Sequence, residues 1–253
     1  MGRDFSLDVL RDVAGVPEEQ LLSAIEEAIA VSVLEERPEA RDIRYRFTHA
    51  YFRQTLYGEM IAPRRLRLHN EVAKALERHY QSRLDDHAAE LAEHFAHSST
   101  EEDLRKAVHY GELAGQRAAA VYAHGEAARL LEQALQVQDV LDPHDDTKRY
   151  DLMNALADAL LSAGDPQHVS DEIAPEMFTI AERLGGGDRA AWACWLAIEA
   201  LGRQDAGPVF ATPEWAMWTE RTYRHAAPGS PLRMRADLSA AWTHYAFRPA
   251  ARV

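Results

Sequence analysis

The chain has 253 residues, enough to bury one large core or two small ones without a metal ion or a disulfide to hold them. Apolar residues make up 47% of it and charged residues 27%, a balance that argues against wholesale disorder and against a collagen-like or membrane-spanning chain. A lone cysteine, Cys194, excludes an intramolecular disulfide, and the sequence holds neither a long apolar run nor a signal-peptide core. We therefore expect a cytoplasmic protein with no membrane partner.

Charge is distributed unevenly along the chain. The net charge of −13 opposes nonspecific binding of the whole chain to nucleic acid. Residues 41–83 nevertheless hold ten Arg and Lys against four Asp and Glu. This basic segment therefore carries a net charge of +6, and the rest of the chain carries −19. Such a segment is typical of a nucleic-acid contact, of a docking surface for acidic protein parts, or of solvated helix faces. These three readings stay open at this point.

The first 30 residues predict two helices. Apolar residues from Phe5 to Ala14 recur at roughly helical spacing, and the pattern stops at Gly15, a residue typical of helix C-terminal caps. Pro17 then favours the first position of a second helix. The buried stripe of this second helix is predicted to consist of Leu21, Leu22, Ile25 and Ile29.

The next segment predicts a small β-hairpin. Residues 31–34 contain β-branched side chains, residues 38–42 form a turn pattern, and residues 43–47 alternate between apolar and basic side chains. This alternation directs Ile43, Tyr45 and Phe47 inward. Thr48 is predicted to cap a returning helix. Two helices, a hairpin and a returning helix together indicate a winged-helix-like module over residues 1–62.

Amphipathic helices follow one another from residue 63 onward, with no comparable strand pattern. We expect helices over about 66–80, 87–96 and 100–120, the last with a capping pattern at Thr100. Further helical pairs are predicted to start near Tyr150, Ala190 and Leu232.

Small residues in this region have the spacing of tetratricopeptide repeats. The small and large packing positions of such a repeat match Gly115, Ala127, Leu131 and Ala134. Small side chains are needed there because the two helices of a repeat cross closely. We predict a mainly α fold, with a tetratricopeptide-like solenoid over residues 63–253. Because the last apolar helix has no polar cap after it, we expect the solenoid to be incomplete and the chain to be a piece of a longer protein.

One group of residues has the composition of a metal site. His87, Glu90, His94 and His97 fall on one face of the predicted helix, and imidazole and carboxylate groups one turn apart can share a zinc ion. Four ligands on one straight helix, however, span about 15 Å at about 1.5 Å per residue, which is too far for one ion. We therefore assign these residues to a repeat helix and predict no metal site.

Other motifs favour packing over chemistry. Cys194 lies between Trp192 and Trp195, where a thiol behaves as a small hydrophobe, and no Gly-x-Ser-x-Gly elbow occurs. The run of three glycines at 185–187 predicts a turn between helices rather than a phosphate cradle. An aromatic ligand groove and repeat-core packing both suit the aromatic side chains at Trp215, Trp218 and Tyr223. We favour packing.

Several runs of residues resemble one family of multidomain regulators. They are Gly2 to Leu10, Ala14-Gly15, Tyr45 to Ala50, Arg53 to Tyr57, Arg64 to His69, Ala89 to Phe95 and Ala114-Gly115. These runs are similar to the stretch that follows the nucleotide-binding module in signal-transduction ATPases with numerous domains. That family includes LuxR-type large ATP-binding transcriptional regulators and relatives fused to adenylate or guanylate cyclase domains. The resemblance covers about the first 140 residues.

The resemblance implies a winged-helix connector followed by tetratricopeptide-like helical pairs, which receive a signal and restrain an ATPase. The family's phosphate loop, Gly-x-x-x-x-Gly-Lys-Ser/Thr, does not occur in this sequence, and neither does the C-terminal helix-turn-helix of the LuxR-type members. Without that loop, the backbone amides and the lysine that hold the phosphates of ATP are missing. ATP is therefore expected only in an upstream domain outside this chain, and the chain itself is assigned no catalytic residue and no cofactor.

We accordingly expect a non-catalytic regulatory and protein-interaction segment of an ATP-dependent signalling or transcriptional regulator. Its expected partners are a protein or peptide on the repeat surface and the ATPase domain of the parent protein. The candidate docking surface consists of Arg53, Arg64, Arg65 and Arg67. An independent tetratricopeptide scaffold is the first alternative.

A DNA-binding winged-helix protein is the second alternative. Arg44, Arg46 and Arg53 are placed to contact phosphate from a wing and its neighbouring helix. The helix before the hairpin, however, carries four glutamates and no cation between residues 18 and 30, and it would repel phosphate. We therefore favour a protein-facing role over a nucleic-acid partner.

Overall fold

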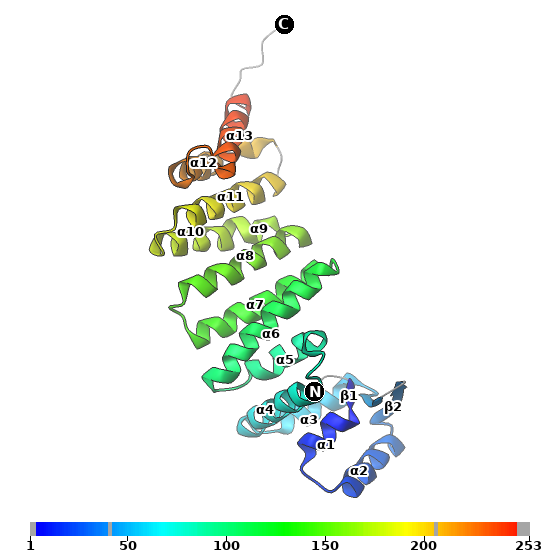
Figure 1. Ribbon diagram of the computed structural model, residues 1–253. Helices are drawn as coiled ribbons and strands as arrows, with labels where there is room; N and C mark the ends of the chain where they lie inside the picture. Colours follow the sequence, from blue (N-terminus) through cyan, green and yellow to red (C-terminus); the bar gives the residue numbers. More distant parts are fainter. Residues whose placement is uncertain (1–3, 40–41, 205–206, 247–253) are drawn as a thin grey trace. The chain divides into compact units, whose positions relative to one another are not determined.

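The computed structural model of the chain describes residues 4–39, 42–204 and 207–246 (Figure 1). Expectations on Gly2, Arg3, Arg41 and residues 247–253 lie outside these ranges. The fold is mainly helical with a small antiparallel sheet near the N-terminus, which confirms the predicted class. The chain divides into two compact units, Met1–Ala114 and Gly115–Val253, so the expected division at residue 62 lies inside the first unit. None of the described helices combines the length and the apolar character needed to cross a membrane.

Three short strands form the sheet in the order β1-β3-β2. They are β1 (Asp4–Ser6), β2 (Leu34–Glu39) and β3 (Asp42–Phe47), and both pairings are antiparallel. The predicted hairpin is present, but a third strand joins it, because Phe5 lies opposite Tyr45 rather than in a helix. Ser6 ends this strand and caps α1 (Leu7–Ala14), since its hydroxyl oxygen accepts a hydrogen bond from the Asp8 amide at 3.2 Å. Gly15 ends α1 in the left-handed conformation that was expected.

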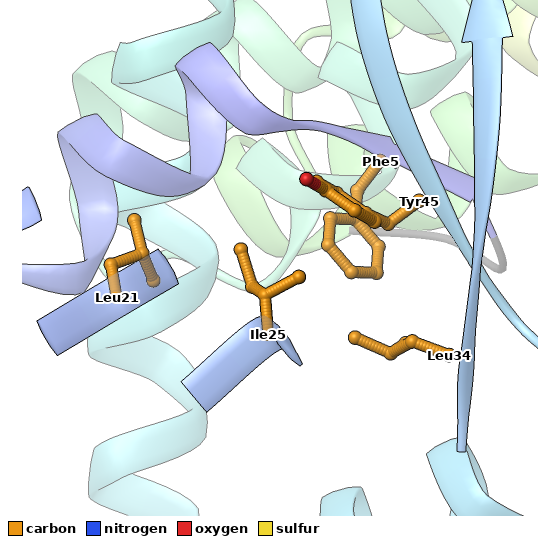
Figure 2. Close-up of a cluster of buried hydrophobic side chains, with 5 residues drawn as sticks. All are labelled: Phe5, Leu21, Ile25, Leu34 and Tyr45. Carbon is orange, nitrogen blue, oxygen red and sulfur yellow. The ribbon is translucent and has the colours of Figure 1, made fainter. Parts of the chain in front are cut away.

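A small core lies between the sheet and α2 (Glu18–Ala30). Figure 2 shows its five buried side chains, Phe5, Leu21, Ile25, Leu34 and Tyr45. Two of the predicted inward positions are wrong. Leu22 is exposed, because it is turned away from Leu21 on the helix surface. Ile43 is also exposed, since it lies near the turn end of the hairpin, opposite Pro38, away from the cluster.

The returning helix α3 (Ala50–Glu59) contributes no buried residue. Its N-cap is His49, whose Nδ1 accepts a hydrogen bond from the Tyr51 amide, so the prediction that Thr48 caps this helix is wrong. The Thr48 hydroxyl instead donates to the Ser32 carbonyl at 2.6 Å and ties the end of β3 to the preceding turn. The first unit continues with α4 (Ala62–His79), a 3₁₀ turn (Leu84–His87) and α5 (Ala88–Ala96), and the boundary at residue 114 falls within α6 (Glu101–Ala120).

Buried polar contacts hold the later helices of the first unit together. On α6, Lys106 Nζ and Tyr110 OH both donate to the Glu77 carboxylate of α4 at 2.8 Å. Asn70 and Ser98 both donate to the carboxylate of Asp103, which lies in the first turn of α6. α4 also packs against α1 and α5. These contacts make α4 the element on which the first unit is assembled.

In the second unit, each main helix packs against the next one along the chain (Figure 1). These helices are α7 (His124–Leu141), α8 (Asp146–Ala163), α10 (Ala174–Arg183), α11 (Gly187–Gln204), α12 (Pro213–His225) and α13 (Pro231–Ala246). A short α9 (Pro166–His168) and a π-helical turn (Val169–Ile173) lead into α10, so the helical segment begins before residue 173, earlier than the start near Ile173 that the sequence pattern predicts. A 3₁₀ turn (Pro208–Ala211) precedes α12.

Two features of the second unit bear on the sequence predictions. α12 was not predicted as a helix. Trp215 and Trp218, which lie on α12, are buried, in line with the packing interpretation. On α13, Met234, Leu238 and Trp242 are exposed by 61%, 56% and 42% and follow one another four residues apart. They therefore form an apolar stripe on one face of that helix.

A close helix crossing that requires a small side chain occurs where the end of α6 packs against α7. A Cβ atom built on Gly115 would lie 2.7 Å from Leu131 Cγ, closer than side-chain carbon atoms approach. Ala127 and Ala134 are both buried on α7. The glycine therefore permits a helix crossing that a larger side chain would push apart.

A larger residue at Gly115 should destabilise the fold. We expect Gly115→Leu to lower the free energy of unfolding by about 1–3 kcal/mol or more through overpacking, measured by urea denaturation. Gly125→Leu is the matched control, because nothing lies within 4 Å of a Cβ at that position. Equal stability of the two variants would show that Gly115 has no packing role.

Candidate binding cavity

A cavity of about 600 Å³ opens within the first unit, between α1, the end of β3, α3, α4 and α5. This volume lies in the range of sites that bind small molecules. Eight of its seventeen lining residues have apolar side chains: Leu10, Val13, Ala14, Phe47, Leu56, Met60, Leu68 and Val72. Because residues far apart in sequence build this lining, the cavity depends on the packing of the whole unit.

Three arginines line the cavity, and we call them the cavity arginines: Arg53 on α3, and Arg64 and Arg65 in the first turn of α4. Among the residues that the structure describes, none of the three forms an ion pair with a carboxylate. The Arg65 guanidinium lies over the Tyr57 ring, 5.3 Å from its centroid. Glu93 of α5 is the single carboxylate among the lining residues, so the lining carries a net positive charge.

The fourth arginine of the expected docking surface lies elsewhere. Arg67 does not line the cavity, and its Nε lies 3.6 Å from Glu71 Oε1 on the exposed side of α4. Successive residues of an α-helix are rotated by about 100° around its axis, so Arg67 points well away from Leu68 and Val72, which face the cavity. The structure therefore brings three of the four proposed arginines together and separates the fourth.

A hydrogen-bonded histidine pair forms the inner wall. His69 Nδ1 lies 2.9 Å from His94 Nδ1, and Tyr57 OH lies 3.0 Å from His69 Nε2. The ring of His97 packs against that of His69 at an interplanar angle of 46°, with centroids 4.0 Å apart. Two nitrogens at that distance need one donor and one acceptor, which two neutral imidazoles provide. Sequence reasoning missed His69, because nothing local to α4 indicates that it will meet residues of α5.

Burial keeps this pair uncharged. Burial lowers the pKa of His69 to about 4, and electrostatic repulsion from nearby His97 contributes to this shift. Burial, with a smaller contribution from a charge on His69, likewise lowers the pKa of His94 to about 2. Both side chains are therefore neutral at pH 7. The arginines then supply the positive charge of the cavity without a contribution from these two histidines.

The four residues weighed as metal ligands do not form one cluster. His87 lies at the end of the 3₁₀ turn, stacks on Tyr80 and has its Nδ1 3.8 Å from Glu90 Oε2. His94 and His97 contact His69 instead. Throughout the described ranges, no three His, Cys, Asp or Glu side chains are arranged to hold a metal ion.

The remaining motifs lie in the second unit and are structural. Cys194 is buried in α11, and burial raises the pKa of its thiol to about 12, so the reactive thiolate is disfavoured. Gly185 adopts the left-handed conformation after α10, and the glycine run forms the predicted turn between α10 and α11. Tyr223 bonds to Asp237 and is not part of an aromatic groove with Trp215 and Trp218.

Comparison of the chain with protein-family models, with curated proteins and with solved structures gave no significant match. The roles of the residues described above therefore rest on their geometry and chemistry.

The neutral histidine pair predicts a pH dependence of stability. In the unfolded chain these histidines bind protons below about pH 6.5, whereas in the folded chain they stay neutral to lower pH. The unfolded state then binds more protons, so the free energy of unfolding should fall as the pH drops from about 6.5 to about 4. His94→Gln should flatten this dependence in urea denaturation series, and an unchanged slope would contradict the assignment.

Proposed function

We propose that the chain is a non-catalytic regulatory and protein-interaction segment of an ATP-dependent signalling or transcriptional regulator that works in the cytoplasm. The observation that carries this proposal is the set of cavity arginines, which have no described acidic partner and stand beside an apolar lining. The resemblance to multidomain signal-transduction ATPases supports it. Any ATPase or cyclase activity belongs to domains outside this chain.

Exposed apolar side chains surround the cavity arginines. Tyr51 and Leu56 on α3, Ile61 before α4 and Leu66 on α4 are each exposed by more than two fifths. Arginine together with exposed aromatic and aliphatic side chains is typical of protein-binding surfaces. We infer that this winged-helix-like part docks an acidic, partly apolar surface of the ATPase domain.

The tetratricopeptide-like second unit would supply the regulatory input. A protein or peptide that binds its helical pairs shifts the equilibrium between docked and released arrangements only by its difference in affinity for the two. The exposed stripe on α13 supports a role of this unit in protein contacts. The same stripe favours an independent tetratricopeptide scaffold as the second candidate.

A DNA-binding role receives less support. Arg46, one of the three arginines proposed to contact phosphate, pairs with Asp4, and Arg78 lies 3.7 Å from Asp12. Part of the basic segment is therefore neutralised within the chain. The four glutamates of α2 remain on the helix that precedes the hairpin.

The docking proposal is tested with the parent reading frame. We expect it to encode a phosphate-loop ATPase domain that binds this chain, and Arg64→Glu with Arg65→Glu to weaken that binding at least tenfold by calorimetry, because repulsion replaces attraction. Arg67→Glu is the matched control on the same helix and should have a much smaller effect.

Two results would contradict the docking proposal. One is a reading frame without such a domain, or a domain whose binding ignores Arg64 and Arg65. The other is salt-dependent binding of DNA by the full chain, which would instead favour the DNA-binding alternative.

A further inference from the structure

We propose that the cavity of the first unit is a binding site for an amphipathic carboxylate, a small molecule with an apolar body and one acidic group. This inference concerns a ligand of the chain by itself and does not require the docking of an ATPase domain. It rests on three features of the cavity: its apolar lining, the cavity arginines and the uncharged inner wall.

The apolar lining suits the body of the ligand. Leu10 and Val13 come from α1, Met60 precedes α4, and Leu68 and Val72 come from one face of α4. The side chain of Val72 is buried, whereas Met60 and Leu68 are partly exposed, so apolar surface of the unit remains open to solvent here. When a hydrocarbon chain covers this surface, the apolar side chains and the hydrocarbon are both removed from water, which is favourable. The volume of about 600 Å³ accommodates a ligand rather than a single water or ion.

The cavity arginines suit the acidic group. Arg64 and Arg65 are adjacent on α4, and Arg53 reaches the same cavity from α3. A guanidinium group presents paired N–H donors that match the two oxygens of a carboxylate. Arg65 is held over the Tyr57 ring, which reduces the entropy that it would lose on binding.

The chain's own carboxylates do not occupy these arginines. Elsewhere in the described residues, Arg149 pairs with Asp139 and Glu176, and Arg183 pairs with Asp146. No such partner is formed at Arg53, Arg64 or Arg65 in the part of the chain that the structure describes. Among the described residues, an external anion therefore meets no carboxylate already paired with these arginines, and Glu93, the carboxylate of the lining, forms no ion pair with them.

The inner wall explains why the rest of the ligand should be apolar and uncharged. His69 satisfies both of its ring nitrogens, one with His94 and the other with Tyr57. His69 therefore has no free hydrogen-bonding nitrogen to offer to a ligand. A ligand with a polar body would lose its hydrogen bonds to water without replacement at this residue. A cationic ligand would be repelled by the arginines.

A series of ligands tests the proposal without any variant. Decanoate, 1-decanol, acetate and a decyltrimethylammonium salt are titrated into the full chain by calorimetry, each below its solubility or micelle limit. We expect saturable binding of one decanoate per chain, at least tenfold weaker binding of 1-decanol, and no measurable binding of acetate or of the ammonium salt. Equal binding of decanoate and 1-decanol, or no binding of decanoate, would overturn the proposal.

A pair of variants then locates the acidic group. Arg64→Gln with Arg65→Gln should weaken decanoate binding at least tenfold, while Arg67→Gln, outside the cavity on the same helix, should change it less than twofold. Circular dichroism and thermal unfolding establish that each variant is folded, and the ligand series still decides the proposal if one is not. Equal losses in the two variants would overturn the assignment of the site.

These measurements use the chain alone, so they can fail while the docking proposal stands, and the reverse is also possible. If both hold, the ligand and the ATPase domain would compete for the same arginines, a consequence that rests on the proposed function. If the chain binds an acidic protein segment but does not bind decanoate, the cavity is part of a protein interface only.

Discussion

The functional account of this chain depends on unneutralised guanidinium groups beside apolar surface. Charge beside apolar surface is costly unless it is paired, and this chain pairs Arg46, Arg149 and Arg183 with its own carboxylates. At the cavity of the first unit, no described carboxylate forms an ion pair with the cavity arginines. We propose that an anionic, partly apolar partner complements this surface better than water does, which does not require any catalytic group.

The helices around the cavity determine which charges it displays. α4 carries Arg64 and Arg65 in its first turn and His69 one turn later, and contacts with α1, α5 and α6 position this helix. Burial keeps His69 and His94 neutral, so these two histidines add no positive charge to that of the cavity arginines. The second unit is built differently, from helices whose close crossings depend on residues such as Gly115. The two units thus suit different tasks, one a charged cavity and the other a stack of helical pairs.

Local patterns predicted the helices well, because periodicity and caps act within a few residues. Gly15 and the spacing of Gly115 to Leu131 are examples. Features that depend on distant residues were missed: Phe5 forms a strand only because Tyr45 lies opposite, and His69 joins the cavity only because α5 brings His94 to it. The arginine-rich segment includes α4, but only the orientation of this helix distinguishes Arg64 and Arg65, which line the cavity, from Arg67.

Mapping of methyl resonances by NMR during titration with decanoate tests the central claim most directly, because it shows where an amphipathic anion binds. The account predicts progressive, saturable shifts of the methyl groups that line the cavity, those of Leu10, Val13, Leu68 and Val72, with little change in the second unit. Shifts centred on the exposed stripe of α13, or spread over both units without saturation, would contradict it.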